Sequence, residues 1–197
     1  MEYLKATELS FDSRRQISAL VVDAYYDLVK HFKKDNQITD VLAQSLLLEY
    51  FYVACENGEI ASIIACKKDK PPPVKLDKKV FVKYLGLIMG NIAYPIIQKH
   101  MMEHKYPFKL AEQTGSIEIV ATAPKYRGRG IAQGLAEHVM SEQSYKDYVL
   151  EVIDTNAGAI RLYEKLGFEE TMRTKAPKNA GFNEFIYMKK ETVCISE

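Results

Sequence analysis

The chain has 197 residues, enough to bury a continuous core in one large domain or in a domain with an insertion. Its apolar fraction of 47% is ordinary for a soluble globular protein, and its net charge of +1 gives no long-range field that favours nucleic acid or an anionic membrane. Three cysteines without CxxC spacing argue against a disulfide framework and favour reduced thiols in a cytoplasm. We therefore expect a cytoplasmic protein with no nucleic-acid or membrane partner.

The first third of the chain predicts a strand, two helices and a hairpin, in that order. Residues 2–9 favour a strand, and apolar residues at helical spacing predict a helix over residues 13–28, capped by Asp12 or Ser13. A second, short helix should follow Thr39 and Asp40. Two β-prone runs, 51–55 and 60–66, are separated by a segment that contains Asn57-Gly58, which is typical of a tight hairpin.

Residues 71–112 predict a helical insertion. Three prolines at 71–73 end the hairpin, because proline cannot continue a central strand, and residues 77–104 then favour a helix with a kink at Pro95. The most apolar stretch, 84–102, is interrupted by polar residues and falls short of the roughly 18 apolar residues of a membrane span. We interpret it as a buried or semi-buried helix. The insertion could shape an acceptor pocket, form a dimer surface or add a layer to the core.

Strands alternate with helices in the remaining part of the chain. Strands are predicted over residues 116–122 and 148–153, and helices from Gly128 to about 142 and over 156–166, where Gly167 ends the second helix. Residues 168–172 and 182–188 favour a closing pair of strands. A hairpin followed by this alternation predicts a mixed α/β sheet.

The segment from Arg127 to Ala132 places two glycines where a strand becomes a helix. Gly128 and Gly130 allow the backbone to curl tightly, and the unpaired N–H groups of the first helical turn bind phosphate oxygens. Lys125, Arg127 and Arg129 would add positive charge locally. The spacing fits neither a Walker P-loop nor a dinucleotide-binding fingerprint. A glycine turn with solvated basic side chains is the alternative interpretation.

Arg127-x-x-Gly130-x-Ala132, preceded by a strand and a Pro-x-Tyr turn, resembles the [QR]-x-x-G-x-[GA] cofactor motif of the GNAT superfamily of N-acetyltransferases. The resemblance implies that the preceding strand splays from its neighbour and that Ala121 and Thr122 pair with the pantetheine of acetyl-CoA. It also implies that the pyrophosphate lies over the loop. The residues concerned are Arg127, Gly128, Arg129, Gly130, Ile131 and Ala132.

A second segment, about 30 residues downstream, resembles the N-x-x-A-x-x-x-Y-x-x-x-G-F segment of the same superfamily. Asn156, Ala159, Tyr163, Gly167 and Phe168 occupy its five fixed positions. The resemblance implies that Asn156 contacts the cofactor arm and that the Tyr163 hydroxyl lies near the CoA sulfur, where a phenol can donate a proton to the leaving thiolate. Tyr163 as an ordinary core residue is the alternative, since the chain has 13 tyrosines.

The attacking amine must be neutral, so a base or a chain of water molecules is expected. Glu118 and Glu151, on neighbouring predicted strands, are the candidates for the base. Strand alternation predicts that Glu118, Val120 and Thr122 share one face. Either carboxylate could equally be a solvated strand residue or the partner of a lysine or arginine.

The resemblance implies an α/β (α+β) fold in which a mixed, mostly antiparallel twisted sheet is split at the strand 116–122 and flanked by helices. We expect one domain over residues 1–197, with the insertion at 71–112. The implied activity is direct transfer of an acetyl group from acetyl-CoA to a primary amine of a small-molecule or peptide acceptor in a ternary complex. A non-catalytic acyl-CoA sensor or structural protein is the alternative. No metal is expected, and a homodimer is left open.

His100, Glu103 and His104 form an H-x-x-E-H motif, which is also the signature of a class of zinc peptidases. The two histidines would share one helix face and could bind one metal ion. No clear third ligand follows on a downstream helix, so zinc proteolysis is the remote alternative.

Overall fold

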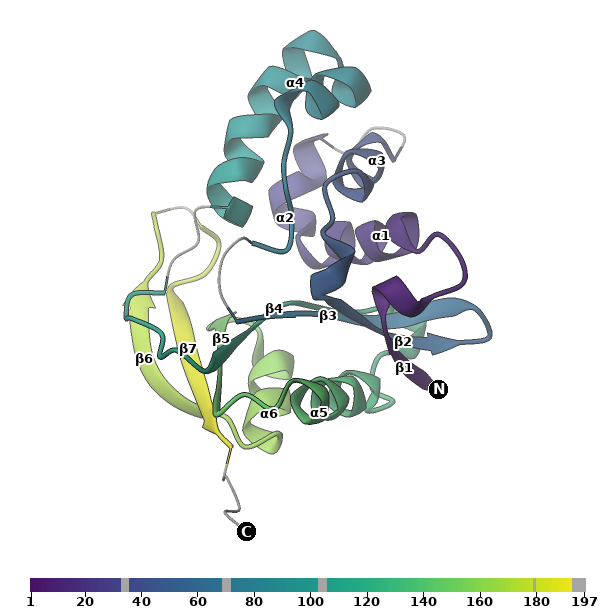
Figure 1. The fold of residues 1–197 in the computed structure, drawn as a ribbon. Helices are drawn as coiled ribbons and strands as arrows, with labels where there is room; N and C mark the ends of the chain where they lie inside the picture. The colour runs from purple at the N-terminus through teal and green to yellow at the C-terminus, as the bar shows by residue number, and fades with distance from the viewer. Residues whose placement is uncertain (33–35, 69–71, 103–105, 179, 193–197) are drawn as a thin grey trace.

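The computed structural model describes residues 1–32, 36–68, 72–102, 106–178 and 180–192 (Figure 1). Within these residues, seven strands form a single sheet in the order β1-β2-β3-β4-β5-β7-β6, and helices cover both faces. Only β4 and β5 pair in parallel, whereas every other neighbouring pair is antiparallel. The predicted mixed, mostly antiparallel sheet is therefore confirmed.

The predicted strands and helices form, with boundaries that shift by a few residues. The strands are β1 (Glu2–Lys5), β2 (Phe51–Glu56), β3 (Glu59–Lys67), β4 (Thr114–Thr122), β5 (Asp147–Ile153), β6 (Glu169–Lys175) and β7 (Glu184–Glu191). The helices are α1 (Arg14–Ala24), α2 (Tyr26–Val29), α3 (Gln37–Ala43), α4 (Lys78–Met102), α5 (Ile131–Gln143) and α6 (Ala157–Lys165). The expected helix over 13–28 is thus divided into α1 and α2.

The apolar residues form two cores, one on each face of the sheet. Helices α1, α3 and α4 cover one face, and α5 and α6 cover the other (Figure 1). The first core is centred on Ile17, Val21, Leu42, Phe51 and Ile63, and the second on Leu135, Val139, Tyr148, Leu150 and Phe168. The sheet is therefore held between two helical layers.

The hairpin between β2 and β3 forms at the predicted position. Asn57 and Gly58 both adopt left-handed conformations, with φ of 54° and 77°, as a two-residue type I′ turn requires. The turn carries a carboxylate on each side, Glu56 and Glu59, next to the segment that follows β4. The hairpin thus contributes to the geometry of the candidate site.

Helix α4 differs from its prediction in the position of its break. Its backbone leaves the helical conformation at Gly86 (φ 80°, ψ 168°) and not at Pro95, which remains within the helix. The two parts of α4 then pack closely, since a Cβ on Gly90 would lie 2.7 Å from the Phe81 carbonyl oxygen. The helix is semi-buried, which is one of the two predicted states: Ala93 and Ile97 lie in the core, whereas Leu87 and Ile88 are exposed.

Candidate active site

The sheet is split between β4 and β5. These strands pair only where Thr114–Ile117 faces Asp147–Leu150, although β4 continues to Thr122 and β5 to Ile153. Both strands are described in full, and beyond Ile117 the edge of β4 that faces β5 makes no strand pairing. The N–H and C=O groups on that edge are therefore available to an extended ligand. The predicted split at this strand is confirmed.

A β-bulge in β4 accompanies the split. Ile119 has a φ of 48°, and the pairing of β4 with β3 shifts register between Ile63 and Ala65. A bulge inserts an extra residue and bends the strand. As a result Glu118, paired with Ala65, lies on the face covered by α1, whereas Val120 packs into the core under α5 and α6. The prediction that Glu118 and Val120 share a face is wrong for this reason.

The predicted phosphate loop begins five residues after β4 ends and leads into α5. Gly128 and Gly130 have φ of 74° and 73°, and a Cβ on either would meet no atom within 4 Å. Gly130 is the N-cap of the 13-residue helix α5. The amides of the first turn have no intrahelical partner, and they carry the positive end of the helix dipole. The loop therefore has the open, donor-rich geometry that fits a diphosphate.

The basic side chains of this loop are each paired with a carboxylate, so their charge is largely neutralised. The pairs are Lys125 with Glu59 at 2.6 Å, Arg127 with Asp23 at 2.5 Å and Arg129 with Glu56 at 3.4 Å. Two of these carboxylates belong to the β2–β3 hairpin and the third to α1. Attraction of an anion by this loop therefore depends on the backbone amides more than on the basic residues.

Both ends of α6 are capped, and the caps fix Tyr163. The Asn156 Oδ1 accepts a hydrogen bond of 3.1 Å from the Ala159 amide at the N-terminal end. At the other end Gly167, with φ of 84°, donates to the Glu164 carbonyl, and Phe168 donates to the Tyr163 carbonyl, which is a Schellman motif. The Phe168 ring packs edge-to-face on the Tyr163 ring at 6.0 Å. The other four residues of the motif thus fix the position of Tyr163.

Tyr163 lies in the α5–α6 core and is 7% exposed. Among the described residues, no group forms a hydrogen bond with its hydroxyl. Burial raises its pKa, and Tyr25 raises it further. Tyr25 follows α1 on the opposite face of the sheet, and burial, Glu118 and Glu151 raise its own pKa to about 12. Tyr25 is therefore close enough to Tyr163, Glu118 and Glu151 to interact with them electrostatically.

Glu118 lies at the start of the unpaired part of β4. Its Oε1 accepts a hydrogen bond of 3.0 Å from the Ser116 hydroxyl and lies 3.2 Å from the Lys67 ammonium. The Ser116 hydroxyl is also 2.9 Å from the Tyr106 hydroxyl. The structure thus gives Glu118 a lysine partner, which was the alternative to its predicted role as a base, and a chain of hydroxyl groups leading to it. The side chain retains 21% exposure.

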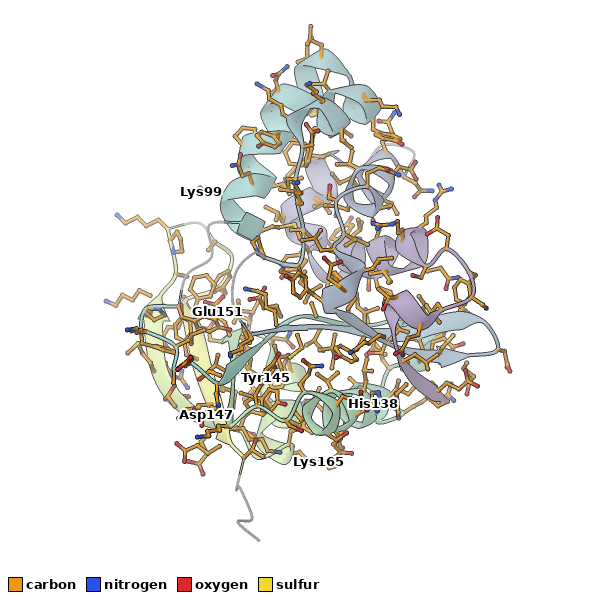
Figure 2. The ribbon with its side chains drawn as sticks, viewed as in Figure 1. Lys99, His138, Tyr145, Asp147, Glu151 and Lys165 are labelled. Carbon is orange, nitrogen blue, oxygen red and sulfur yellow. The ribbon has the colours of Figure 1, made fainter. Side chains whose placement is uncertain are left out.

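Three tyrosines near the two carboxylates were not predicted from the sequence. The ring centroids of Tyr106 and Tyr187 are 6.0 Å apart. Tyr187 pairs across the strands with Glu151 of β5, which is labelled in Figure 2. Burial raises the pKa of Tyr187 to about 12, and Glu151 adds to the shift. Tyr25 completes the group. These residues come from α1, the insertion and β7, and they share no sequence pattern that could have identified them.

The H-x-x-E-H motif lies at the end of α4. Glu103, His104 and the side chain of His100 fall outside the described residues. Within the part of the chain that the structure describes, no group of three His, Cys, Asp or Glu side chains is arranged to hold a metal ion.

Comparison with known proteins assigns the chain to a family. The sequence profile of the Acetyltransferase (GNAT) family matches residues 16–168. The chain belongs to the GNAT acetyltransferase family. The resemblance stated from the two motifs is therefore confirmed.

Among curated relatives, the [Ribosomal protein bS18]-alanine N-acetyltransferase of Salmonella typhimurium is 38% identical over 74 residues. The matched stretch covers 35% of this chain and about half the length of that relative. Among solved structures, an N-acetyltransferase from Staphylococcus aureus Mu50 has a TM-score of 0.65 at 17% identity, covering 96% of this chain and all of the other. The NatC complex bound to Gag peptide and CoA has a TM-score of 0.56, also at 17% identity, covering 97% and 98%. These structures show that the GNAT fold is shared.

Proposed function

We propose that the chain transfers an acetyl group from acetyl-CoA to the primary amine of an acceptor, by direct attack in a ternary complex. The observation that carries the proposal is the unpaired edge of β4, which is followed in the chain by the open glycine turn at the start of α5. Tyr163 lies in the same core cluster as Ile117 and Val120 of β4. Membership of the GNAT acetyltransferase family supports the same activity. It favours an enzyme over a non-catalytic acyl-CoA sensor and gives no support to zinc proteolysis.

The donor would be held mainly by backbone groups. We assign its pyrophosphate to the amides of residues 128–132 and its pantetheine to the free edge at Ala121 and Thr122. Asn156 uses its oxygen to cap α6, so its side-chain NH₂ is the group that remains for the cofactor arm. Acetyl-CoA supplies the activated acetyl group, and the residues of the chain position it.

Tyr163 is assigned to the leaving sulfur. Because burial raises its pKa, the phenol stays protonated throughout the physiological range. Its pKa lies far above the roughly 8.5 of a thiol, so complete transfer of the proton to the thiolate is uphill. We therefore assign Tyr163 as a hydrogen-bond donor whose bond strengthens as negative charge develops on sulfur, a contribution of about 1.5–3 kcal/mol.

Glu118 is assigned to the proton of the amine. Both contacts of its carboxylate use Oε1, so Oε2 is the oxygen available to an incoming amine. The Ser116 and Tyr106 hydroxyls support the orientation of the carboxylate. Attack then takes place beside the bulge at Ile119, where free N–H groups can bind the developing oxyanion.

For the acceptor, we propose the N-terminal amine of a polypeptide. The curated relatives are named for acetylating an alanine of a ribosomal protein. Glu118 and Glu151 lie near the split, and a carboxylate oxygen that is not engaged with Lys67, such as Glu118 Oε2, could accept a hydrogen bond from an ammonium group before it loses its proton. The tyrosines beside them offer flat surfaces for the first residues of a peptide.

The experiment measures thioester loss from acetyl-CoA with a panel of amines. The panel contains an alanine-initiated peptide, the same peptide blocked at its N-terminus but carrying a free lysine, and a polyamine. We expect transfer to the first peptide, and we expect Tyr163→Phe to lower kcat by roughly 10- to 100-fold with little change in the KM for acetyl-CoA. Tyr94→Phe, a partly buried tyrosine in the α4 layer, is the matched control.

Two results would overturn parts of this proposal. Tight binding of CoA without transfer to any amine would support the non-catalytic alternative. Transfer to the polyamine or the lysine, and not to the free N-terminus, would retain the acyltransferase and remove the proposed acceptor class.

A further inference from the structure

Helix α4 carries an exposed apolar surface. Among the described residues, eight large hydrophobic side chains are exposed, and five of them lie on this one helix. Ile88 is 79% exposed and Leu87 72% exposed, and large apolar side chains exposed together in this way mark an interaction surface. We call these five residues the outer stripe: Leu87, Ile88, Met89, Ile92 and Ile96.

The outer stripe and the buried side of α4 lie on opposite sides of the helix. Ile88, Ile92 and Ile96 follow one another at intervals of four, so they form a row along one face. Ala93 and Ile97 face the other way and are fully buried in the core of the α1 layer. The helix is thus anchored by its inner side. It projects beyond the rest of the molecule with the outer stripe uncovered (Figure 1).

Helix α4 is long and apolar enough to be a candidate membrane span over residues 78–99, but its geometry argues against spanning. The helical conformation is broken at Gly86, so the longer part comprises residues 87–102. At 1.5 Å per residue this part is about 24 Å long, less than the roughly 30 Å of a hydrocarbon core. Its inner side is also part of the protein core. An interfacial position, parallel to a surface, is consistent with both facts.

The charges on α4 indicate which surface covers the stripe. No acidic residue occurs between Asp77 and Glu103, whereas the helix carries four lysines, at 78, 79, 83 and 99. Lys99 is seven residues after Ile92 and so lies on the same face, near the end of α4 closer to the sheet (Figure 2). Two copies of this helix packed together would add lysines to lysines, with no carboxylate on either helix to offset them. An anionic surface complements them, and lysine stems can cover apolar surface while their ammonium groups reach outward.

We propose that the outer stripe of α4 binds the surface of an anionic lipid bilayer, with its apolar side chains at the boundary between headgroups and acyl chains and its lysines on the headgroups. The net charge of +1 argued against a membrane partner for the chain as a whole. The local composition of α4 reverses that expectation for this surface. The proposal does not depend on acyl transfer, and its test requires no catalysis.

The test is flotation of the full chain with vesicles of phosphatidylcholine alone and with vesicles containing about 30 mol% phosphatidylglycerol. We expect binding to the anionic vesicles that is at least tenfold stronger than to the neutral ones and that weakens in about 0.5 M salt. Equal binding to both vesicle types, or no binding to either, would overturn the proposal.

Two sets of variants locate the contact. The double variant Leu87→Ser/Ile88→Ser should lose binding at least tenfold. Met89→Ser should weaken it, while Met172→Ser should not, although both methionines are 39% exposed and Met172 lies on β6. The thermal unfolding midpoint of each variant serves as the check on folding. Equal effects of the two methionine variants would refute the assignment to α4. A concentration-dependent dimer that the double variant abolishes, without vesicle binding, would assign the stripe to a second copy of the chain.

Discussion

Replacing Gly130 with alanine separates the conformational role of this residue from its proposed role in binding the donor. The φ of 73° lies in the left-handed region, where a non-glycine residue costs about 1 kcal/mol or more. No atom lies within 4 Å of the added Cβ, so the cost in the free protein is conformational and not steric. For a chain of this length, 1 kcal/mol lowers the unfolding midpoint by roughly 2–4 °C.

The effect on the donor should be much larger. The open side of Gly130 is where the amides that begin α5 would meet the pyrophosphate, and a methyl group there would hold the phosphate away from them. Hydrogen bonds to a charged group are worth about 1.5 kcal/mol or more each, so loss of two weakens CoA binding by roughly 100-fold. Isothermal titration with CoA measures the dissociation constant directly.

Gly181→Ala is the matched control. Gly181 has a φ of 84° and open space around the added Cβ, but it lies between β6 and β7, far along the chain from the loop. Both variants should lose similar stability, and only Gly130→Ala should lose CoA affinity. If the two variants bind CoA equally well, the assignment of the pyrophosphate to this turn is refuted.

Three further predictions concern the base, the packing of α4 and stability at high pH. Glu118→Gln should lower kcat/KM by about 10- to 100-fold near pH 7 and by less at high pH, where the amine is already neutral. If the ratio of wild-type to variant kcat/KM does not change with pH, Glu118 is not the base. Gly90→Ala should destabilise the protein by about 1–3 kcal/mol, because the added Cβ would lie 2.7 Å from backbone atoms. Gly158→Ala in α6 is the control and should be neutral or stabilising, because the nearest atom to its added Cβ is 3.8 Å away. Denaturant titrations measure both free energies of unfolding. Burial raises the pKa of Tyr148 and of Tyr187 to about 12 from 10.0. Between pH 10 and 12 the unfolded chain releases phenolic protons that the folded chain keeps. The free energy of unfolding should therefore be unaffected by these tyrosines below pH 10 and should fall above it, by up to about 1.4 kcal/mol per pH unit for each. A free energy of unfolding that rises between pH 10 and 12 would contradict the burial of these hydroxyls.

Local signals in the sequence were sufficient for the strands, the helices and the two motifs. Asn57-Gly58 predicts the hairpin because both residues tolerate left-handed backbone, and the structure has both there. Gly167 predicts the end of α6 for the same reason. In each case the conformation depends on residues adjacent in the chain, so a single sequence contains the necessary information.

Features that depend on distant contacts could not be predicted. The bulge at Ile119 requires a left-handed β-branched residue, which local preference disfavours, and it becomes visible only through the register of β4 against β3. The position of Tyr25 beside Glu118 depends on the docking of α1 across the sheet. The break of α4 lies at Gly86, where glycine tolerates a φ of 80°, and Gly90 lets the two parts of the helix pack closely, a contact that proline-based reasoning does not include.

The two motifs differ in how they relate to the chemistry. In the loop, the glycines and the helix terminus would contact the donor directly, while the basic side chains are engaged with Asp23 and with the β2–β3 hairpin. In α6, Asn156, Gly167 and Phe168 cap the helix and pack on Tyr163, so most of that motif acts by positioning one phenol. Because α6 has only nine residues, both of its caps lie within two turns of Tyr163, and loss of either cap would loosen the position of that ring. Under this proposal a near-neutral chain would recognise a highly charged donor through backbone geometry and would position the phenol of Tyr163 with a helix that is capped at both ends.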